Sequence, residues 1–526
     1  MLRAFTPDWV VCALLAALAG FNSGCSVTPV SVRETSRRAT VHGETANLRG
    51  SPANAGKISR ERIAEKADLH IDDRTAAKGF ARSGLVVHRI VLAQNYEIKG
   101  LLRHRTAGEG QAAVALLRPQ PQSPLRRFYT ADYVYVPVTI MTGGRSGMSD
   151  ERSNFRVIDD ESPGQGGGNS GALATDTTLP LAMLLSHTRF VPAQYSGLLN
   201  PGDFGGTRGL FLLEPYDSNK IPILMIHGLM SSPLTWKGLT DELLGDAYIR
   251  THYQVWHYVY PTGQSLFYSA KGLRDSLDAV KRAIALARLP QPKPMVVIGH
   301  SMGGLLAKSL VCDSGNNLWD AVFTVRPERL VVSKDALNDL RGSFFFKPRK
   351  DVAKVIFMAT PQRGSYLATN WLGRFGSRLV HLNGGWSAEN RLIAQEEKAY
   401  IRPQMLRYFE RGGSSSIDSL SPKHPLLAAF EGLVPDRRIP CYLIIGSVTR
   451  TLSGVISDGV VTFGSANLQY AKQTIILNGA GHGGVVNDPR ASLWIIDLLK
   501  NDRTASWESS HGRIENSHTA PPSVYQ

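Results

Sequence analysis

Cysteine is scarce in this sequence, and its scarcity argues against a fold held together by disulfides. Four cysteines occur among 526 residues, and two of them, Cys12 and Cys25, lie within the first 25 positions. Small secreted scaffolds that depend on disulfides are much richer in cysteine. We therefore predict that Cys312 and Cys441 are buried free thiols that act as small apolar side chains.

The sequence also lacks an apolar run long enough to span a membrane. The leader run, Trp9 to Phe21, covers about 13 residues and follows Arg3, which suits the core of a signal peptide. Two endings remain open: a small-x-small cleavage site at Ala17 to Ala19, and a lipobox-like segment, Asn22 to Cys25, whose cysteine becomes lipidated. We expect an exported lipoprotein of the bacterial cell envelope, on the periplasmic or outer-membrane side.

Acidic residues are outnumbered by basic ones. The chain has 44 Asp and Glu against 59 Lys and Arg, a formal net charge of +15, which favours affinity for anionic surfaces. No basic run interleaved with aromatic residues is present, and no helix-turn-helix or RNA-binding signature, so nucleic acid is not an expected partner. A composition of 43% hydrophobic and 20% charged residues excludes a fibrous or wholly disordered chain.

One segment, Met295 to Leu310 (MVVIGHSMGGLLAKSL), combines a buried strand, a glycine-rich turn and the start of a helix. Its G-x-S-x-G pattern places Ser301 on a tight strand-to-helix turn, which requires nearly side-chain-free neighbours at Gly299 and Gly303. The first N–H groups of the following helix favour negative charge beside the hydroxyl. Ser301 is therefore the predicted nucleophile, and turn geometry predicts that His300 supports the turn and points away from the chemistry.

A serine nucleophile needs a base and an orienting acid, and both are expected after strands. His482 follows the strand Thr474 to Leu477 in a glycine-rich loop, and an imidazole can take the serine proton and return it. His424 is the weaker alternative, because it precedes a proline in a polar loop.

Asp458 is the predicted acid, because it follows the strand Tyr442 to Gly446 and lies between the serine and the histidine in chain order. Asp436 precedes that strand and Asp488 follows the histidine. Both are better interpreted as exposed carboxylates.

Oxyanion donors are expected where the strand Ile223 to Ile226 runs into His227, Gly228 and Leu229. Gly228 lets the backbone turn its N–H groups toward the nucleophile, so the amides of Leu229 and Met302 are the predicted donors. His227 is interpreted as a structural histidine that holds this loop.

The order of strands and helices predicts an α/β fold with a mostly parallel sheet and covering helices. In the N-terminal region, apolar runs read as strands at Leu85–Leu92, Ala112–Leu117, Tyr133–Met141, Leu179–Leu185 and Gly209–Leu213. The predicted divisions are a signal peptide (1–25), a polar tether (26–57), an N-terminal region whose strands partly join or decorate the sheet (58–215), a catalytic domain (216–500) with a cap around 361–440, and a disordered tail (501–526).

These segments together resemble the α/β-hydrolase superfamily, and more narrowly the lipase-like serine esterases of bacterial envelopes related to the PGAP1-like group. The matching segments are IPILMIHGLMSSPLTW (221–236), YPTGQS (260–265), IGHSMGGLLAK (298–308), ATPQRGS (359–365), SDGVV (457–461) and GAGHGGVV (479–486). The order Ser, Asp, His matches the family. Gln362 departs from it, because relatives carry histidine at that position.

The resemblance implies hydrolysis of carboxylic esters through an acyl-enzyme, with an ester or lipid substrate and no metal or organic cofactor. Two alternatives remain open. The same three residues serve an acyltransferase that passes the acyl group to an alcohol or lipid acceptor, or the chain is a non-catalytic, envelope-anchored scaffold. If Cys25 is lipidated, the membrane surface is a further partner.

Overall fold

The computed structural model describes residues 30–35, 80–129, 132–141, 154–157, 172–187, 208–366, 385–450 and 455–501. Several expected segments lie outside the described residues: the signal peptide with its Cys25, most of the tether, and all of the tail after Asn501. No helix within the described ranges is long and apolar enough to cross a membrane.

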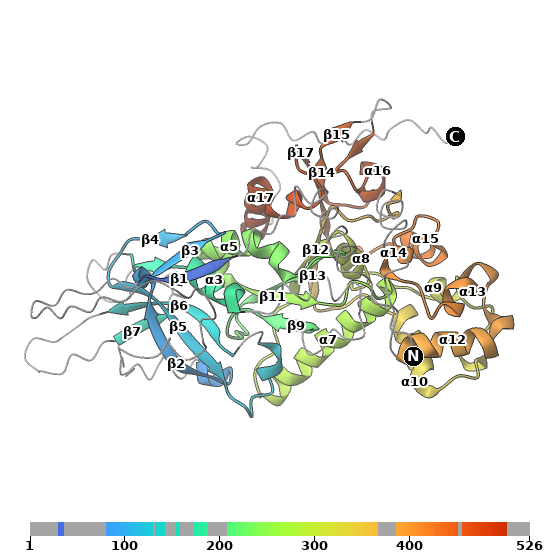
Figure 1. The fold of residues 1–526 in the computed structure, drawn as a ribbon, viewed down its shortest axis with the longest axis horizontal. Helices are drawn as coiled ribbons and strands as arrows, with labels where there is room; N and C mark the ends of the chain where they lie inside the picture. The colour runs from blue at the N-terminus through green and yellow to red at the C-terminus, as the bar shows by residue number, and fades with distance from the viewer. Residues whose placement is uncertain are drawn as a thin grey trace, which may run out of the picture.

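A seven-stranded sheet forms the centre of the molecule (Figure 1). Six strands run parallel, and one edge strand, β9, pairs antiparallel with β11. The spatial order is β17 (Gln473–Asn478), β14 (Cys441–Ser447), β13 (Val352–Met358), β12 (Met295–His300), β10 (Ile221–Ile226), β11 (Tyr253–Val259) and β9 (Gly209–Leu212). The predicted mostly parallel sheet is confirmed, and β9 joins it although its sequence lies upstream of the predicted catalytic domain.

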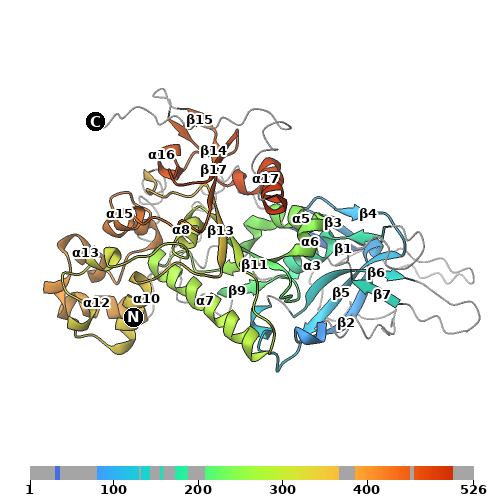
Figure 2. The ribbon, with the colours of Figure 1, turned by 180° about the vertical axis from the view of Figure 1, so that it is seen from behind.

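Helices cover both faces of this sheet, because parallel strands are apolar on each side. On one face pack α7 (Leu266–Leu286) and α8 (Met302–Lys308), with Leu273, Leu277 and Leu305 in the core. On the other face pack α5 (Lys237–Gly245), α6 (Ala247–His252) and α17 (Pro489–Lys500). Figure 2 shows the same arrangement from behind.

The N-terminal region forms a second, antiparallel sheet beside the β9 edge of the central sheet (Figures 1 and 2). Its strands are β2 (Leu85–Leu92), β5 (Gln111–Pro119), β6 (Val134–Met141) and β7 (Asn154–Val157). Shorter pairs join β1 (Ser31–Glu34) to β3 (Tyr96–Lys99), and β4 (Arg105–Thr106) to β8 (Thr175–Asp176). Thus a short stretch of the expected tether is an ordered strand.

The expected strand at Leu179–Leu185 is wrong, because this run lies in helix α3 (Thr178–His187). Its residues are buried throughout, so neither a two-residue nor a 3.6-residue period is visible. The local cues favour a helix: Pro180 stands in the first turn, and Oδ1 of Asp176 accepts the Leu179 N–H at 3.0 Å.

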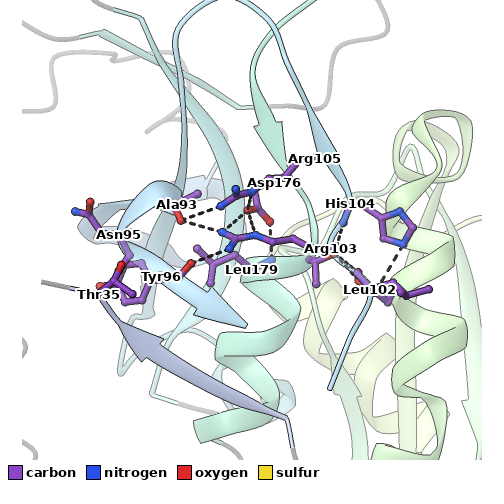
Figure 3. A network of polar contacts seen from close by, with 12 residues as sticks. Thr35, Ala93, Asn95, Tyr96, Leu102, Arg103, His104, Arg105, Asp176 and Leu179 are labelled. Carbon is purple, nitrogen blue, oxygen red and sulfur yellow. Dashed lines mark hydrogen bonds and ion pairs between the residues drawn. The ribbon is translucent and has the colours of Figure 1, made fainter. Parts of the chain in front are cut away.

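Asp176 is also the centre of a polar network that ties α3 to the N-terminal strands (Figure 3). Its fully buried Oδ2 accepts hydrogen bonds from Arg103 at 2.7 Å and from Arg105 at 2.9 Å. Arg103 also donates to the carbonyls of Tyr96 (2.7 Å) and Ala93 (2.9 Å). A buried carboxylate needs such partners to offset its lost hydration.

A group of helices lies beyond α8, on the side of the molecule away from the N-terminal sheet (Figures 1 and 2). They come from two insertions, one before β13 and one after it: α9 (Asn317–Asp320), α10 (Lys334–Phe344), α12 (Gly385–Glu396), α13 (Pro403–Glu410), α14 (Ser416–Ser419) and α15 (Pro425–Glu431). Main-chain hydrogen bonds join them, including Thr324 N–H to the Tyr400 carbonyl (2.9 Å) and Arg402 N–H to the Val322 carbonyl (2.8 Å). The helical region therefore draws on more of the chain than the predicted cap.

Candidate active site

Ser301 lies between β12 and α8 with a backbone that side-chain-bearing residues rarely adopt. Its φ is 53° and its ψ is −126°, a left-handed conformation that costs on the order of 1–3 kcal/mol. The Ser301 N–H donates to the Met358 carbonyl of the neighbouring strand at 2.9 Å, which helps to hold the turn. This is the backbone that the G-x-S-x-G pattern requires.

The glycines around Ser301 leave no room for a side chain. A β-carbon on Gly299 would lie 2.6 Å from the Gly304 Cα, and one on Gly303 would lie 2.1 Å from the Ile226 carbonyl oxygen. Gly304 is equally constrained, since its β-carbon would meet the Thr360 Oγ1 at 1.9 Å. The turn is therefore packed between the strands on either side of β12.

The structure brings Ser301, His482 and Asp458 into one chain of hydrogen bonds. His482 Nε2 lies 2.9 Å from Ser301 Oγ, and His482 Nδ1 lies 2.7 Å from Asp458 Oδ2. A carboxylate accepts only, so Nδ1 carries the proton and Nε2 is free to accept from the serine hydroxyl. The arrangement can move a proton from Ser301 to His482 without any rearrangement of side chains.

Asp458 is held as an anion. Burial alone raises its pKa, but the charge and hydrogen bond of His482 and the amides of Val461 and Val460 together bring that pKa below its ordinary value. Those amides donate to Oδ1 at 2.6 and 2.8 Å. The His482 N–H donates to the Asp458 carbonyl at 2.9 Å, so main chain and side chain both join these residues.

His300 lies beside the hydrogen-bond chain of Ser301, His482 and Asp458 and is not one of its members. Its Nε2 donates to the main-chain carbonyl of His482 at 2.9 Å, and the two rings lie 5.0 Å apart. Burial, and then the charge of His482, lowers the pKa of His300 to about 3, which keeps it neutral. The ring also meets Trp236 edge to face at 6.4 Å. His300 therefore supports the loop that carries His482.

The segment 227–230, which we call the oxyanion loop, runs beside Ser301. A β-carbon on Gly228 would lie 2.8 Å from the Ser301 Cβ and 3.2 Å from His300 Nδ1. Met302 is the first residue of α8, so its N–H is one of the four that have no acceptor within the helix. The loop of Leu229 and the start of α8 thus both lie next to Ser301.

The residues that the sequence offered in place of His482 and Asp458 make other hydrogen bonds and ion pairs. The buried His424 lies 2.9 Å from Ser414 Oγ, and burial lowers its pKa to about 4. Asp436 pairs with Arg438 at 2.6 Å, and Asp488 pairs with Arg490 at 2.7 Å at the start of α17. None of the three takes part in the hydrogen-bond chain of Ser301.

Gln362 is fully buried, and neither atom of its amide has a hydrogen-bond partner among the described residues. Its neighbour Arg363 donates to the carbonyls of Gly464 (2.6 Å) and Asn467 (2.8 Å) and pairs with Glu431. The segment 359–365 thus connects the strand-to-helix turn of Ser301 to the helical region.

Cys312 and Cys441 are buried free thiols, as predicted, and burial raises the pKa of each to about 12.

In the described ranges, no group of three or more His, Cys, Asp or Glu side chains is arranged to hold a metal ion. Sequence reasoning included four further residues in the segments that resemble the family but gave them no role: Trp236, Tyr260, Thr262 and Thr360.

The chain belongs to the alpha/beta hydrolase family, whose family model matches residues 223–493, just over half of the chain. That match runs from β10 to α17 and includes all the residues of the hydrogen-bond chain. The predicted α/β-hydrolase fold and superfamily are therefore confirmed, and the protein is a hydrolase. No curated protein sequence matches the chain.

Several solved structures are similar in part. The mature lipase BlEst2 of Bacillus licheniformis is 15% identical, with 55% of this chain and 97% of that chain covered and a TM-score of 0.33. EstA from Clostridium botulinum is 15% identical over 54% and 87% of the chains, with a TM-score of 0.31. Lipase 1 from Pelosinus fermentans is 13% identical over 54% and 98%, with a TM-score of 0.29.

Proposed function

We propose that this hydrolase cleaves carboxylic esters through an acyl-enzyme on Ser301. The observation that carries the proposal is the unbroken chain from Asp458 through His482 to Ser301, with the serine on a strained turn. A hydrogen-bonded base beside a hydroxyl is what nucleophilic acyl transfer needs.

In the first half of the reaction, His482 Nε2 takes the Ser301 proton as Oγ attacks the ester carbonyl carbon. The carbonyl oxygen gains negative charge, which the amides of Leu229 and Met302 stabilise. The tetrahedral intermediate then expels the alkoxide, which takes the proton from His482 and leaves as the alcohol. Asp458 stabilises the imidazolium that forms in between.

In the second half, water attacks the acyl-enzyme. His482 takes one proton from the water, the ester bond to Ser301 Oγ breaks, and the proton returns to Oγ. The carboxylic acid leaves and the free enzyme is restored. His300, hydrogen-bonded to the His482 carbonyl, holds the base in place through both halves.

The test uses a fluorophosphonate probe and p-nitrophenyl esters of short and long acyl chains on wild type and Ser301→Ala. We expect labelling and turnover in the wild type and neither in Ser301→Ala, with unchanged thermal unfolding. Ser414→Ala is the matched control, because Ser414 is also hydrogen-bonded to a histidine but lies in the helical region. Labelling that persists in Ser301→Ala contradicts the proposal. Products formed with an added alcohol separate hydrolysis from acyl transfer.

We also propose that the protein is exported and anchored by a lipid on Cys25, with a lipid-like ester of the envelope as substrate. The leader run and the segment Asn22 to Cys25 support this, as does the narrower resemblance to the PGAP1-like group. Expression in a bacterium should place the wild type in the membrane fraction and Cys25→Ser in the soluble fraction. Identical fractionation of the two contradicts the anchor.

A further inference from the structure

Each peptide group of the oxyanion loop is hydrogen-bonded to a side chain. Tyr260 Oη donates to the His227 carbonyl at 2.8 Å, which orients the peptide group between His227 and Gly228. His227 Nδ1 donates to the Gly228 carbonyl at 3.0 Å, which orients the next one. The Met230 N–H donates to Thr262 Oγ1 at 3.3 Å, which orients the third.

These contacts determine the direction of the Leu229 N–H. In a trans peptide the C=O and N–H groups point in opposite directions, and the chain has no cis bond in its described part. Because the Gly228 carbonyl faces the His227 imidazole, the Leu229 N–H points away from that ring. Gly228, the residue before this amide, lies against Ser301.

The loop needs this support because its backbone is strained. Met230 has a φ of 53°, in the left-handed region, where a residue with a β-carbon is disfavoured by about 1–2 kcal/mol. The hydrogen bond to Thr262 opposes relaxation of the Met230 amide toward an ordinary conformation. Such relaxation would rotate the peptide group that follows Leu229.

The supporting residues are themselves held firmly. Tyr260 and Thr262 are 1% and 2% exposed, and hydrogen bonds in such dry surroundings are strong. The rings of Tyr260 and His227 stack at 4.6 Å, with 15° between their planes. The helical region also holds the segment that carries Thr262, since the Ser416 N–H of α14 donates to the carbonyl of Gly263, the next residue, at 3.3 Å.

We propose that Tyr260 and Thr262 are positioning residues that aim the Leu229 amide at the oxyanion of the reaction. They hold the two peptide groups on either side of the one that carries this amide. The inference rests on the proposed function, because it assigns a role in stabilising a charge that forms only during acyl transfer. Both side chains act through the loop backbone, to which their hydroxyls are hydrogen-bonded.

The test compares Tyr260→Phe and Thr262→Val, which remove only the hydroxyl from each hydrogen bond. We expect kcat for a p-nitrophenyl ester to fall about tenfold in each, with KM within about twofold of wild type, because an oxyanion donor acts mainly in the transition state. Affinity for a trifluoromethyl ketone, which forms a tetrahedral adduct, should fall by the same factor as kcat. Thr262→Ser should restore both.

Matched controls make the same chemical changes elsewhere. Tyr253 Oη donates to the Leu499 carbonyl at 2.8 Å, and Thr139 Oγ1 donates to the Ala174 carbonyl at 2.9 Å. Tyr253→Phe and Thr139→Val should lose stability without losing kcat. Titration with the fluorophosphonate measures the concentration of active sites, and each kcat is calculated from that concentration. A partly misfolded variant therefore does not show a falsely low kcat.

Two failures can be told apart. A wild type without Ser301-dependent turnover contradicts the proposed function itself. A wild type with such turnover, whose Tyr260→Phe and Thr262→Val variants keep kcat and ketone affinity, contradicts only the positioning role. Equal losses in the two control variants contradict it as well.

Discussion

The backbone of Gly228 lies directly against the side chain of Ser301. A β-carbon at position 228 would be 2.8 Å from the Ser301 Cβ, closer than two carbons approach without displacement. A side chain at position 228 therefore requires either the oxyanion loop or the Ser301 turn to shift.

Gly228→Ala should lower kcat by about 10²-fold or more, because it displaces either the serine or the loop that carries a proposed oxyanion donor. The unfolding temperature should also fall, since the added methyl group meets the Ser301 Cβ at 2.8 Å and the ring and carbonyl of His300 at 3.2 Å, so kcat is referred to titrated active sites. Gly464→Ala is the control, because a β-carbon there meets no atom within 4 Å. Equal kcat in the two variants would contradict this contact.

Asp458→Asn should lower kcat by about 10³- to 10⁴-fold, because an amide no longer stabilises the imidazolium and favours the wrong tautomer of His482. The amide keeps the shape of the carboxylate, so the fold should persist. Steady-state kinetics with active-site titration measures the loss. Asp436→Asn, in which the pair with Arg438 is removed instead, should retain wild-type kcat.

Asp241 should make the protein less stable as the pH rises. Burial raises its pKa to about 7, although the Thr178 hydroxyl donates to it at 2.8 Å and opposes that shift. Between its ordinary pKa of 3.8 and about 7, the folded state binds the proton and the unfolded state does not, so stability falls as pH rises.

Asp241→Asn should therefore be more stable than wild type at pH 8, by at most about 4 kcal/mol at 1.36 kcal/mol per pKa unit. The difference should vanish below pH 4. Urea unfolding at pH 4, 6 and 8 measures it. A difference that does not depend on pH would show that the carboxyl does not titrate in this range.

Lys308 should have the opposite pH dependence. Its ammonium is fully buried, donates to the Glu431 carbonyl at 3.1 Å and lies 5.0 Å from the centre of the Phe430 ring. Burial lowers its pKa from 10.5 to about 8. The unfolded state binds more protons between these values, so this residue makes stability rise with pH over that range.

Lys308→Met should raise the free energy of unfolding at pH 7 by about 1–3 kcal/mol, because the buried charge is replaced by an apolar chain of similar length. The gain should shrink as the pH approaches 10.5. Chemical unfolding at pH 7 and pH 10 tests this, with the exposed Lys347→Met as the control. A destabilised Lys308→Met at pH 7 would mean that the hydrogen bond outweighs burial.

Local patterns carried much of the prediction. The buried run Met295 to Ile298, followed by glycines around Ser301, specifies a strand and a tight turn, because only glycine tolerates the contacts at positions 299 and 303. The three residues of the hydrogen-bond chain each follow, along the sequence, a strand that was predicted to belong to the parallel sheet. Since such strands end at the same edge, chain order alone was enough to put Ser301, Asp458 and His482 forward.

The sequence by itself thus determined the parallel sheet, the elbow and the candidate residues, because these depend on short-range periodicity and on backbone constraints of single residues. Only the tertiary structure decided that 179–185 is a helix, that His300 supports His482, and that Tyr260 and Thr262 hold the oxyanion loop. These features depend on contacts between residues far apart in the chain, some 30 positions for the loop and 182 for the two histidines. A local sequence pattern does not specify such contacts, because the burial and the hydrogen-bond partners of a side chain are set only when the strands and helices pack together.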